Sequence, residues 1–206
     1  MGEDGDTTMT AQGLKQAIRR RIITGREQLP AALRAQYSAE IVRRIVQLPE
    51  YQSARGVLGY MNFGAEFESE ILVRQVLADG KQLLLPKVNA ASRELDVYHV
   101  ADVDTQLAPG AYAIREPVPE CCTIAGLGDV DFILLPGVVF GRDGARLGYG
   151  GGFYDKLMAR LQHHPALVAG AYSMQLAQGI PQEATDRKVE WLVTENETLH
   201  CVTRLK

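Results

Sequence analysis

Short runs of apolar residues, without the polar interruptions of a half-exposed strand, recur along this chain of 206 residues. The runs lie at residues 57–61, 82–86, 132–136, 166–172 and 191–193. Continuous apolar runs indicate strands covered on both faces, which is typical of parallel sheets in α/β proteins. They predict an α/β fold in which a mostly parallel central sheet is flanked by helices.

Segments in which apolar residues recur at helical spacing precede these runs and lie between them. The predicted helices span residues 11–29, 30–48 and about 71–77. Pro30 separates the first two, Pro49 ends the second and Gly80 ends the third, since proline breaks a helix and glycine favours its C-terminal end. The pattern weakens at residues 87–129, where 94–98 reads as an edge or hairpin strand and the rest as a long loop.

Composition narrows the class of protein. The net charge of −3 provides no basic stripe for nucleic acid, and no apolar run approaches the ~18–20 residues that span a membrane. Cys121, Cys122 and Cys201 lack the spacing of a zinc site and indicate free thiols in a cytoplasmic protein. Residues 1–10 are polar and predict a flexible tail, so residues 11–206 form the single domain.

Glycine is concentrated in one stretch. Seven of the sixteen residues 137–152 are glycine, where average usage predicts about one. The stretch follows an apolar run and precedes a helix expected from Phe153, so its backbone N–H groups can wrap an anion. Arg146 adds a cation, and the aromatic Tyr149 indicates a flat organic ligand. The stretch predicts a phosphate-binding or nucleotide-binding loop; the alternative is a flexible turn that binds nothing.

The sequence RLGYGGGFYD at 146–155 closely resembles the central motif of the 5-formyltetrahydrofolate cyclo-ligase family. Similar family segments occur in order over about residues 11–195: Lys15 with Arg19, Tyr60 with EFES at 66–69, Gly80-Lys81, Leu85-Pro86, IREP at 114–117, and Ile180-Pro181 with Asp186. Two positions depart from the family pattern. Ser69 replaces a threonine but keeps its hydroxyl, and Gly151 replaces a lysine that many members carry, which leaves the phosphate-binding role to other cations.

The resemblance implies a fold like that of sugar-phosphate isomerases and CoA transferases. It also implies the ATP-dependent and Mg²⁺-dependent conversion of 5-formyltetrahydrofolate, with or without a polyglutamate tail, to 5,10-methenyltetrahydrofolate, ADP and phosphate. Phosphorylation of the formyl oxygen would turn it into a leaving group for ring closure. We expect no nucleic-acid or membrane partner, and a monomer or homodimer. Two alternatives are a different phosphate-ligand enzyme on this fold and a non-catalytic folate-binding module.

The resemblance also implies site residues. Those for ATP are Lys15, Arg19, Arg146, Leu147, Gly148, Tyr149, Gly150, Gly151, Gly152, Phe153 and Tyr154. Those for the folate are Met61, Glu66, Tyr112, Tyr149, Gly150, Gly151, Gly152 and Phe153. Asp155 and Asp186 are the implied Mg²⁺ ligands.

Structural alternatives stay open for several of these residues. Lys15 and Arg19 lie four apart and could form a solvated basic face. Glu66 could be one of several carboxylates at a helix N-terminus, and Asp155 could interact only with a helix dipole. Asp186 could be a turn residue. Met61 could belong to the core, and Tyr112 could be an exposed loop aromatic.

Overall fold

The computed structural model describes residues 10–110, 113–183 and 186–201. An eight-stranded sheet lies at its centre, in the order β12-β11-β10-β7-β1-β2-β3-β6. Its strands are β1 (Gly56–Leu58), β2 (Gln82–Asn89), β3 (Glu94–Val100), β6 (Thr123–Ile124), β7 (Phe132–Leu134), β10 (Ala166–Gly170), β11 (Trp191–Val193) and β12 (Thr198–His200). The strands from β11 to β2 are parallel, and β12, β3 and β6 pair antiparallel at the two edges. The predicted mostly parallel sheet is confirmed.

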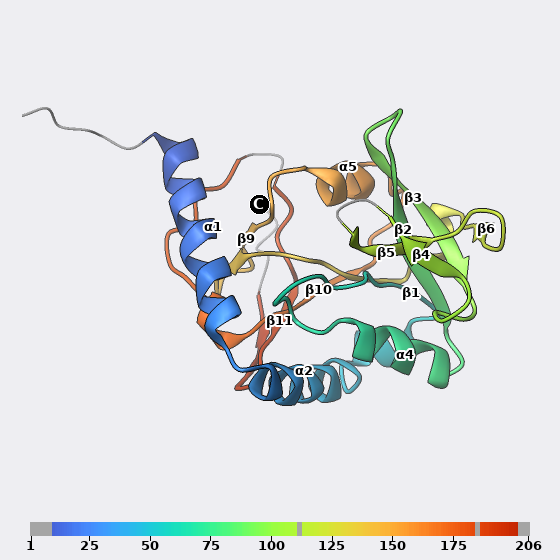
Figure 1. Ribbon diagram of the computed structural model, residues 1–206, viewed down its shortest axis with the longest axis horizontal. Helices are drawn as coiled ribbons and strands as arrows, with labels where there is room; N and C mark the ends of the chain where they lie inside the picture. The colour runs from blue at the N-terminus through green and yellow to red at the C-terminus, as the bar shows by residue number, and fades with distance from the viewer. Residues whose placement is uncertain (1–9, 111–112, 184–185, 202–206) are drawn as a thin grey trace, which may run out of the picture.

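Helices cover both faces of this sheet (Figure 1). They are α1 (Ala11–Gln28), α2 (Ala31–Ile45), α3 (Pro49–Ser53), α4 (Glu70–Ala78) and α5 (Phe153–Ala159). Alternate strand residues point to opposite faces, so Val57 packs in the cluster that contains Ile41 of α2 and Val73 of α4. The next residue, Leu58, packs in the cluster that contains Leu157 of α5. This two-sided burial explains the continuous apolar runs.

Helix α1 stands beside the sheet rather than on either face (Figure 1). It begins where the Thr10 side chain accepts a hydrogen bond from the backbone N–H of Gly13 at 3.1 Å, as an N-cap does. Ile22 packs with Val138 and Leu147 in a third, smaller core cluster. Helix α1 thereby covers the glycine-rich part of the chain.

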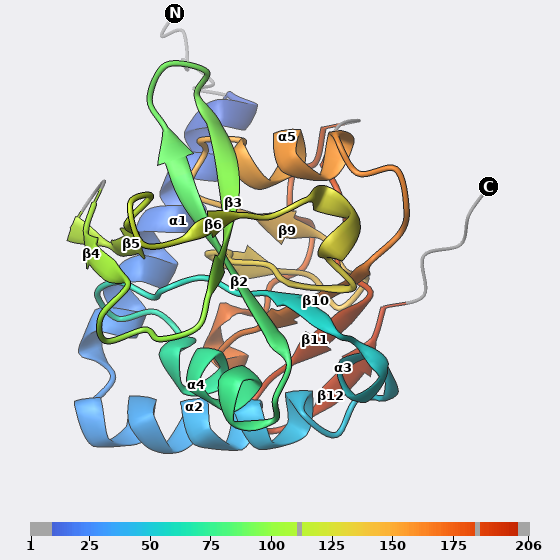
Figure 2. The same cartoon turned by 90° about the vertical axis from the view of Figure 1, so that its right-hand side faces the viewer.

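The segment between β3 and β7, which the sequence predicts as a long loop, contains a hairpin. Between β3 and β7, strands β4 (Leu107–Pro109) and β5 (Arg115–Pro117) pair with each other, and β6 extends the main sheet. The β4–β5 hairpin lies at the left of Figure 2, and the long β2–β3 hairpin rises past the sheet beside α5.

The glycine-rich stretch is likewise not one loop. Strands β8 (Val139–Phe140) and β9 (Arg146–Leu147) form a hairpin within it. The carbonyl of Gly141 accepts a hydrogen bond from the N–H of Gly144, which closes the hairpin turn. The irregular part is residues 148–152, which we call the glycine segment.

Gly170 lies in close contact with the segment that leads from β1 to α4 and with α2. A Cβ at this position would lie 2.8 Å from the Phe67 ring and 3.0 Å from Ile41, and both side chains are buried. We expect Gly170→Ala to lower the free energy of unfolding by about 1–3 kcal/mol through overpacking. Urea denaturation measures this change. Gly128→Ala is the matched control, because no atom lies within 4 Å of its added Cβ, and an equal loss in both variants would contradict the packing argument.

Candidate active site

One cavity of about 2120 Å³ connects α1, the glycine segment, α5 and the chain that follows β1. Pockets for single small ligands usually measure about 300–1,000 Å³, so this cavity is larger than one such ligand requires. Every predicted site residue that the structure describes lines the cavity: Lys15, Arg19, Met61, Glu66, residues 146–154, Asp155 and Asp186. The predicted Tyr112 lies outside the described residues. Residues far apart in sequence therefore meet at one place.

Helix α1 presents its basic residues to the glycine segment. Arg19 Nε donates a hydrogen bond to the Gly148 carbonyl at 2.7 Å. Lys15 Nζ lies 2.7 Å from Glu183 Oε1, in a chain segment that also lines the cavity. The two side chains lie one helical turn apart, as their spacing predicts. They line the cavity on the same side of α1 and contact other segments of the chain.

The glycine segment adopts a backbone that other residues rarely reach. Gly150 has φ 100° and Gly152 has φ 66°, in the left-handed half of conformational space that favours glycine. A Cβ at Gly151 would lie 2.7 Å from the Phe153 ring. The structure therefore agrees with the absence of a lysine at position 151, because the Phe153 ring occupies the space in which a lysine side chain would begin.

Arg146 and Asp155 form an ion pair on the cavity wall. Arg146 is buried, its Nη2 lies 2.7 Å from Asp155 Oδ1, and its Nη1 donates to the Pro136 carbonyl at 3.2 Å. Arg146 Nε is buried without a hydrogen-bond partner among the described residues. A buried donor without a partner is costly, so this atom marks a place where an anionic ligand would be stabilised.

The two predicted metal ligands lie close together. Asp155 and Asp186 both line the cavity, and the backbone N–H of Arg187 points to Asp155 Oδ1 at 3.5 Å. Asp186 Oδ2 accepts a hydrogen bond from the N–H of Glu183 at 2.7 Å, as a turn residue does. Among the described residues, no group of three or more His, Cys, Asp or Glu side chains gathers around a common metal position. Asp155 and Asp186 are two carboxylates, and a Mg²⁺ site usually takes one or two from the protein.

Glu66 is a buried carboxylate with both oxygens occupied. Its Oε1 accepts a hydrogen bond from the Tyr149 hydroxyl at 2.7 Å, and its Oε2 accepts one from the Phe63 N–H at 3.1 Å. Burial raises the pKa of Glu66 above its ordinary value, while these donors and the nearby Arg26 oppose that rise. Glu66 stands apart from the carboxylates at the start of α4, and its partners hold it as a hydrogen-bond acceptor.

Two residues that the sequence did not single out contact Tyr149, one at the cavity wall and one behind it. Phe63 packs its ring against that of Tyr149, with centroids 5.3 Å apart, and lines the cavity. Arg26 donates to the Tyr149 hydroxyl at 2.6 Å. The spacing of Arg26 from Arg19, seven residues or two helical turns, is the sequence signal that could have identified it.

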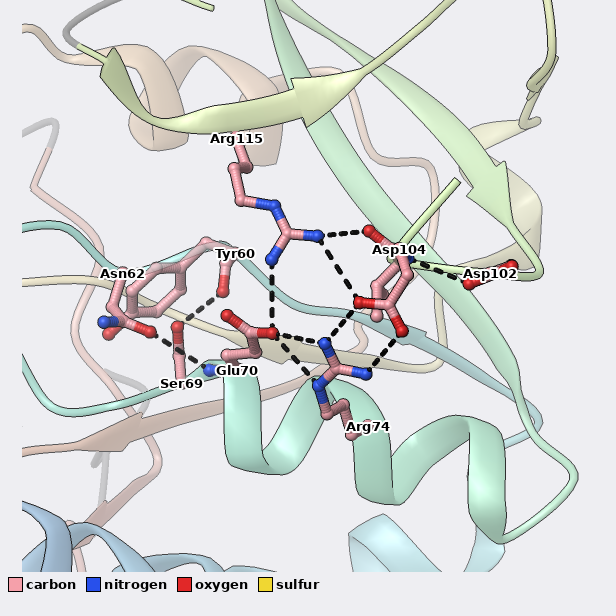
Figure 3. A network of polar contacts seen from close by, with 9 residues as sticks. Tyr60, Asn62, Ser69, Glu70, Arg74, Asp102, Asp104 and Arg115 are labelled. Carbon is pink, nitrogen blue, oxygen red and sulfur yellow. Dashed lines mark hydrogen bonds and ion pairs between the residues drawn. The ribbon is translucent and has the colours of Figure 1, made fainter. Parts of the chain in front are cut away.

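The segment between β1 and α4, which carries Glu66, is held at its end by a polar network (Figure 3). Ser69 Oγ donates to the Tyr60 carbonyl at 2.5 Å, and the Glu70 N–H donates to Asn62 Oδ1 at 3.2 Å. These bonds close the ends of the segment against each other. The hydroxyl that Ser69 shares with threonine therefore has a structural role.

The same network reaches the β4–β5 hairpin (Figure 3). The Glu70 carboxylate pairs with Arg74 at 2.7 Å and with Arg115 at 3.2 Å, and Arg74 pairs with Asp104 at 2.6 Å. Arg115 lies in β5 and lines the cavity. Glu70 thus connects the start of α4 to the hairpin that forms another part of the cavity wall.

Fold and cavity together define a class: an α/β protein whose cavity joins a glycine-rich segment to a buried carboxylate. The model of the 5-formyltetrahydrofolate cyclo-ligase family matches residues 11–195. A curated 5-formyltetrahydrofolate cyclo-ligase from Mus musculus is 25% identical over 91% of this chain and 97% of its own length. One from Mycolicibacterium smegmatis is 30% identical over 87% of this chain and 93% of its own length.

A solved structure agrees with these matches. The NMR structure of Aquifex aeolicus 5,10-methenyltetrahydrofolate synthetase is 33% identical to this chain, with a TM-score of 0.81 over 94% of this chain and 95% of the other. The chain belongs to the 5-formyltetrahydrofolate cyclo-ligase family. Its activity is that of the family, cyclisation of a folate substrate with use of ATP. The family match supports the cyclo-ligase activity over the two alternative functions that the sequence left open.

The protonation of Glu66 generates a prediction. Because burial raises its pKa above the ordinary 4.5, the carboxylate gains a proton at a higher pH than an exposed glutamate and then no longer accepts two hydrogen bonds. We expect kcat/KM for the folate to fall as pH decreases through that raised pKa. The Glu66→Gln variant should have a low kcat/KM without this acidic limb, as pH–rate profiles would show. An identical acidic limb in Glu66→Gln would assign it to another group.

Proposed function

We propose that the cavity binds ATP and 5-formyltetrahydrofolate together and transfers the γ-phosphoryl group of ATP to the formyl oxygen. The observation that supports this most directly is the continuity of the cavity from the glycine segment to Glu66. Phosphoryl transfer depends mainly on positioning and charge neutralisation. The chain supplies groups for both ligands. Backbone N–H groups and cations would hold the ATP, and a buried carboxylate with aromatic rings would hold the folate.

The chemistry proceeds in two steps. A formamide oxygen is a poor leaving group, so its attack on the γ-phosphorus, with ADP leaving, first converts it to a phosphate ester. The amine nitrogen N10 then attacks the former carbonyl carbon, and loss of inorganic phosphate together with the N10 proton leaves the methenyl bridge. Both steps gain from an enclosed site that aligns the two substrates and excludes water.

The ATP side would be formed by Lys15, Arg19 and residues 146–154. Lys15 and Arg146 are already paired with Glu183 and Asp155, so the ATP phosphates would share these cations with the carboxylates. The unpartnered Nε of Arg146 offers a further donor. The backbone N–H groups of the glycine segment can approach the phosphates closely because no Cβ intervenes.

The folate side would be formed by Met61, Glu66, Tyr112 and the segment from Tyr149 to residue 153. Met61 is buried and belongs to the main hydrophobic core as well as to the cavity wall. It would offer an apolar contact to the pterin ring. Glu66 would accept hydrogen bonds from the N–H groups of the pterin, and the exposed face of the Tyr149 ring would border the folate.

Asp155 and Asp186 would hold Mg²⁺. Their carboxylate oxygens suit this hard cation, which takes only one or two protein carboxylates and keeps water and phosphate oxygens as its other ligands. Bound there, Mg²⁺ would neutralise charge on the ATP phosphates. The protein residues themselves orient the phosphates and keep the formyl group against the glycine segment.

The chain would act as a monomer or a homodimer in the cytoplasm. Within the described ranges, no helix is long and apolar enough to cross a membrane, and the cysteines at 121, 122 and 201 are free thiols. Light scattering after gel filtration measures the oligomeric state.

The direct test is turnover by the purified protein. With 5-formyltetrahydrofolate, ATP and Mg²⁺ we expect the near-ultraviolet absorbance of the methenyl product to rise, and one ADP to form for each product molecule. Omission of ATP is the control. Product formation without ADP release would contradict phosphorylation of the formyl oxygen.

A second test addresses the metal role. We expect Asp155→Asn to lower kcat by about 10²-fold or more, the size typical of a lost electrostatic contact in the transition state. The dissociation constant of the folate should change less than threefold, because the metal acts on the phosphoryl group. Asp96→Asn is the control, since Asp96 bonds to Asn89 away from the cavity. Equal losses of binding and turnover in Asp155→Asn would contradict the metal role.

A further inference from the structure

Arg26 is a buried cation without a carboxylate in direct contact among the described residues. Its side chain lies in α1 and is only 3% exposed, although arginine is almost never fully buried unless it is paired. Arg26 does not line the cavity. Its Nη2 donates to the Tyr149 hydroxyl, and its Nε has no hydrogen-bond partner within the described chain. Burying this cation without a paired carboxylate lowers the stability of the fold, which indicates that Arg26 has a specific role.

The Tyr149 hydroxyl connects three separate parts of the chain. It accepts a hydrogen bond from Arg26 of α1 at 2.6 Å and donates one to Glu66 at 2.7 Å. The Arg26 guanidinium carbon also lies 5.9 Å from the centre of the Tyr149 ring, within the range of a cation–π contact. The hydroxyl is therefore held with its proton directed toward Glu66, because its lone pair already faces a cation.

Tyr149 is also the one residue with a side chain between Leu147 and Phe153. The glycines around it are free to adopt many backbone conformations, and fixing each costs about 1–2 kcal/mol of entropy. Within the described residues, two hydrogen bonds from α1 hold the glycine segment. Arg19 donates to the Gly148 carbonyl, and Arg26 donates to the Tyr149 hydroxyl. These arginines lie two helical turns apart on one face of the same helix.

We propose that Arg26 is a positioning residue that acts through Tyr149, anchoring the glycine segment against Glu66 so that the nucleotide and folate halves of the cavity stay in register. This inference rests on the proposed function, because it takes the glycine segment as the ATP side and Glu66 as part of the folate side. It adds a residue that touches neither ligand. It also makes the two halves energetically dependent on each other through one hydroxyl group.

A coupling between the ligands follows from this connection. When ATP orders the glycine segment, Tyr149 is ordered with it, and Glu66 is then oriented for the folate at no further entropic cost. Nucleotide should therefore tighten folate binding in the intact protein. The coupling should disappear when either the Arg26 cation or the Tyr149 hydroxyl is removed.

The test compares Arg26→Met, Tyr149→Phe and the double variant. Isothermal titration calorimetry gives the dissociation constant of 5-formyltetrahydrofolate, with and without a non-hydrolysable ATP analogue and Mg²⁺. We expect each single variant to bind folate about tenfold more weakly in the presence of the analogue, the size of one lost hydrogen bond to a charged group. The double variant should be no weaker than the singles, because both changes break the same connection.

Arg21→Met is the matched control. Arg21 is an exposed arginine of the same helix, so its removal changes the net charge equally and should leave folate binding within twofold of the wild type. Arg26→Lys keeps a positive charge at this position but lacks the planar guanidinium group. Its loss of folate affinity should therefore be smaller than that of Arg26→Met. Because Arg26 is buried, a folding defect in Arg26→Met would obscure its effect on binding, so Tyr149→Phe tests the same connection independently: Tyr149 is 41% exposed, and removing its hydroxyl leaves no cavity in the core.

Two outcomes would overturn the role of Arg26: unchanged folate affinity in Arg26→Met, or a double variant whose losses multiply to about a hundredfold. Failure of the proposed function is distinguishable, because the wild-type protein would then neither consume ATP nor bind the folate. Normal wild-type turnover with an unaffected Arg26→Met variant would reject only the positioning role.

Discussion

The glycine segment can approach an anion because it has almost no side chains, and for the same reason it cannot hold its own shape. The structure resolves this conflict by anchoring the segment from α1. Arg19 reaches a carbonyl of the segment and Arg26 reaches its one tyrosine hydroxyl. Helix α1 must therefore stand beside the sheet, and its Ile22 packs on the β8–β9 hairpin that leads into the segment.

Charge in the cavity is balanced locally. Lys15 faces Glu183 and Arg146 faces Asp155, each at 2.7 Å, so the cations are stabilised before any ligand arrives. Burying an unpaired cation would be far more costly. The net charge of −3 is consequently compatible with small anionic ligands. Anionic substrates are attracted by donors within the cavity rather than by the field of the whole protein.

Periodicity predicted the parts of the fold whose packing is decided by apolar burial. The helices around 11–29 and 71–77 and the strand at 191–193 are all confirmed, the last with the same limits. The hairpins β4–β5 and β8–β9 were missed. Their strands are only two or three residues long, too short for an alternating pattern, and β8–β9 lies in a glycine-rich stretch that has no such signal.

The site, like the fold, has features that the sequence predicts and features that only the tertiary structure shows. The sequence alone determined which residue types were available: a glycine segment, a basic helix face, a carboxylate at 66 and others at 155 and 186. Only the tertiary structure decided their partners. It placed Arg26 behind Tyr149, filled the space beside Gly151 with the Phe153 ring and joined the α4 network to Arg115. The physical reason is range: helical and strand spacing reports neighbours within one element, whereas these contacts join segments that only the sheet and α1 bring together.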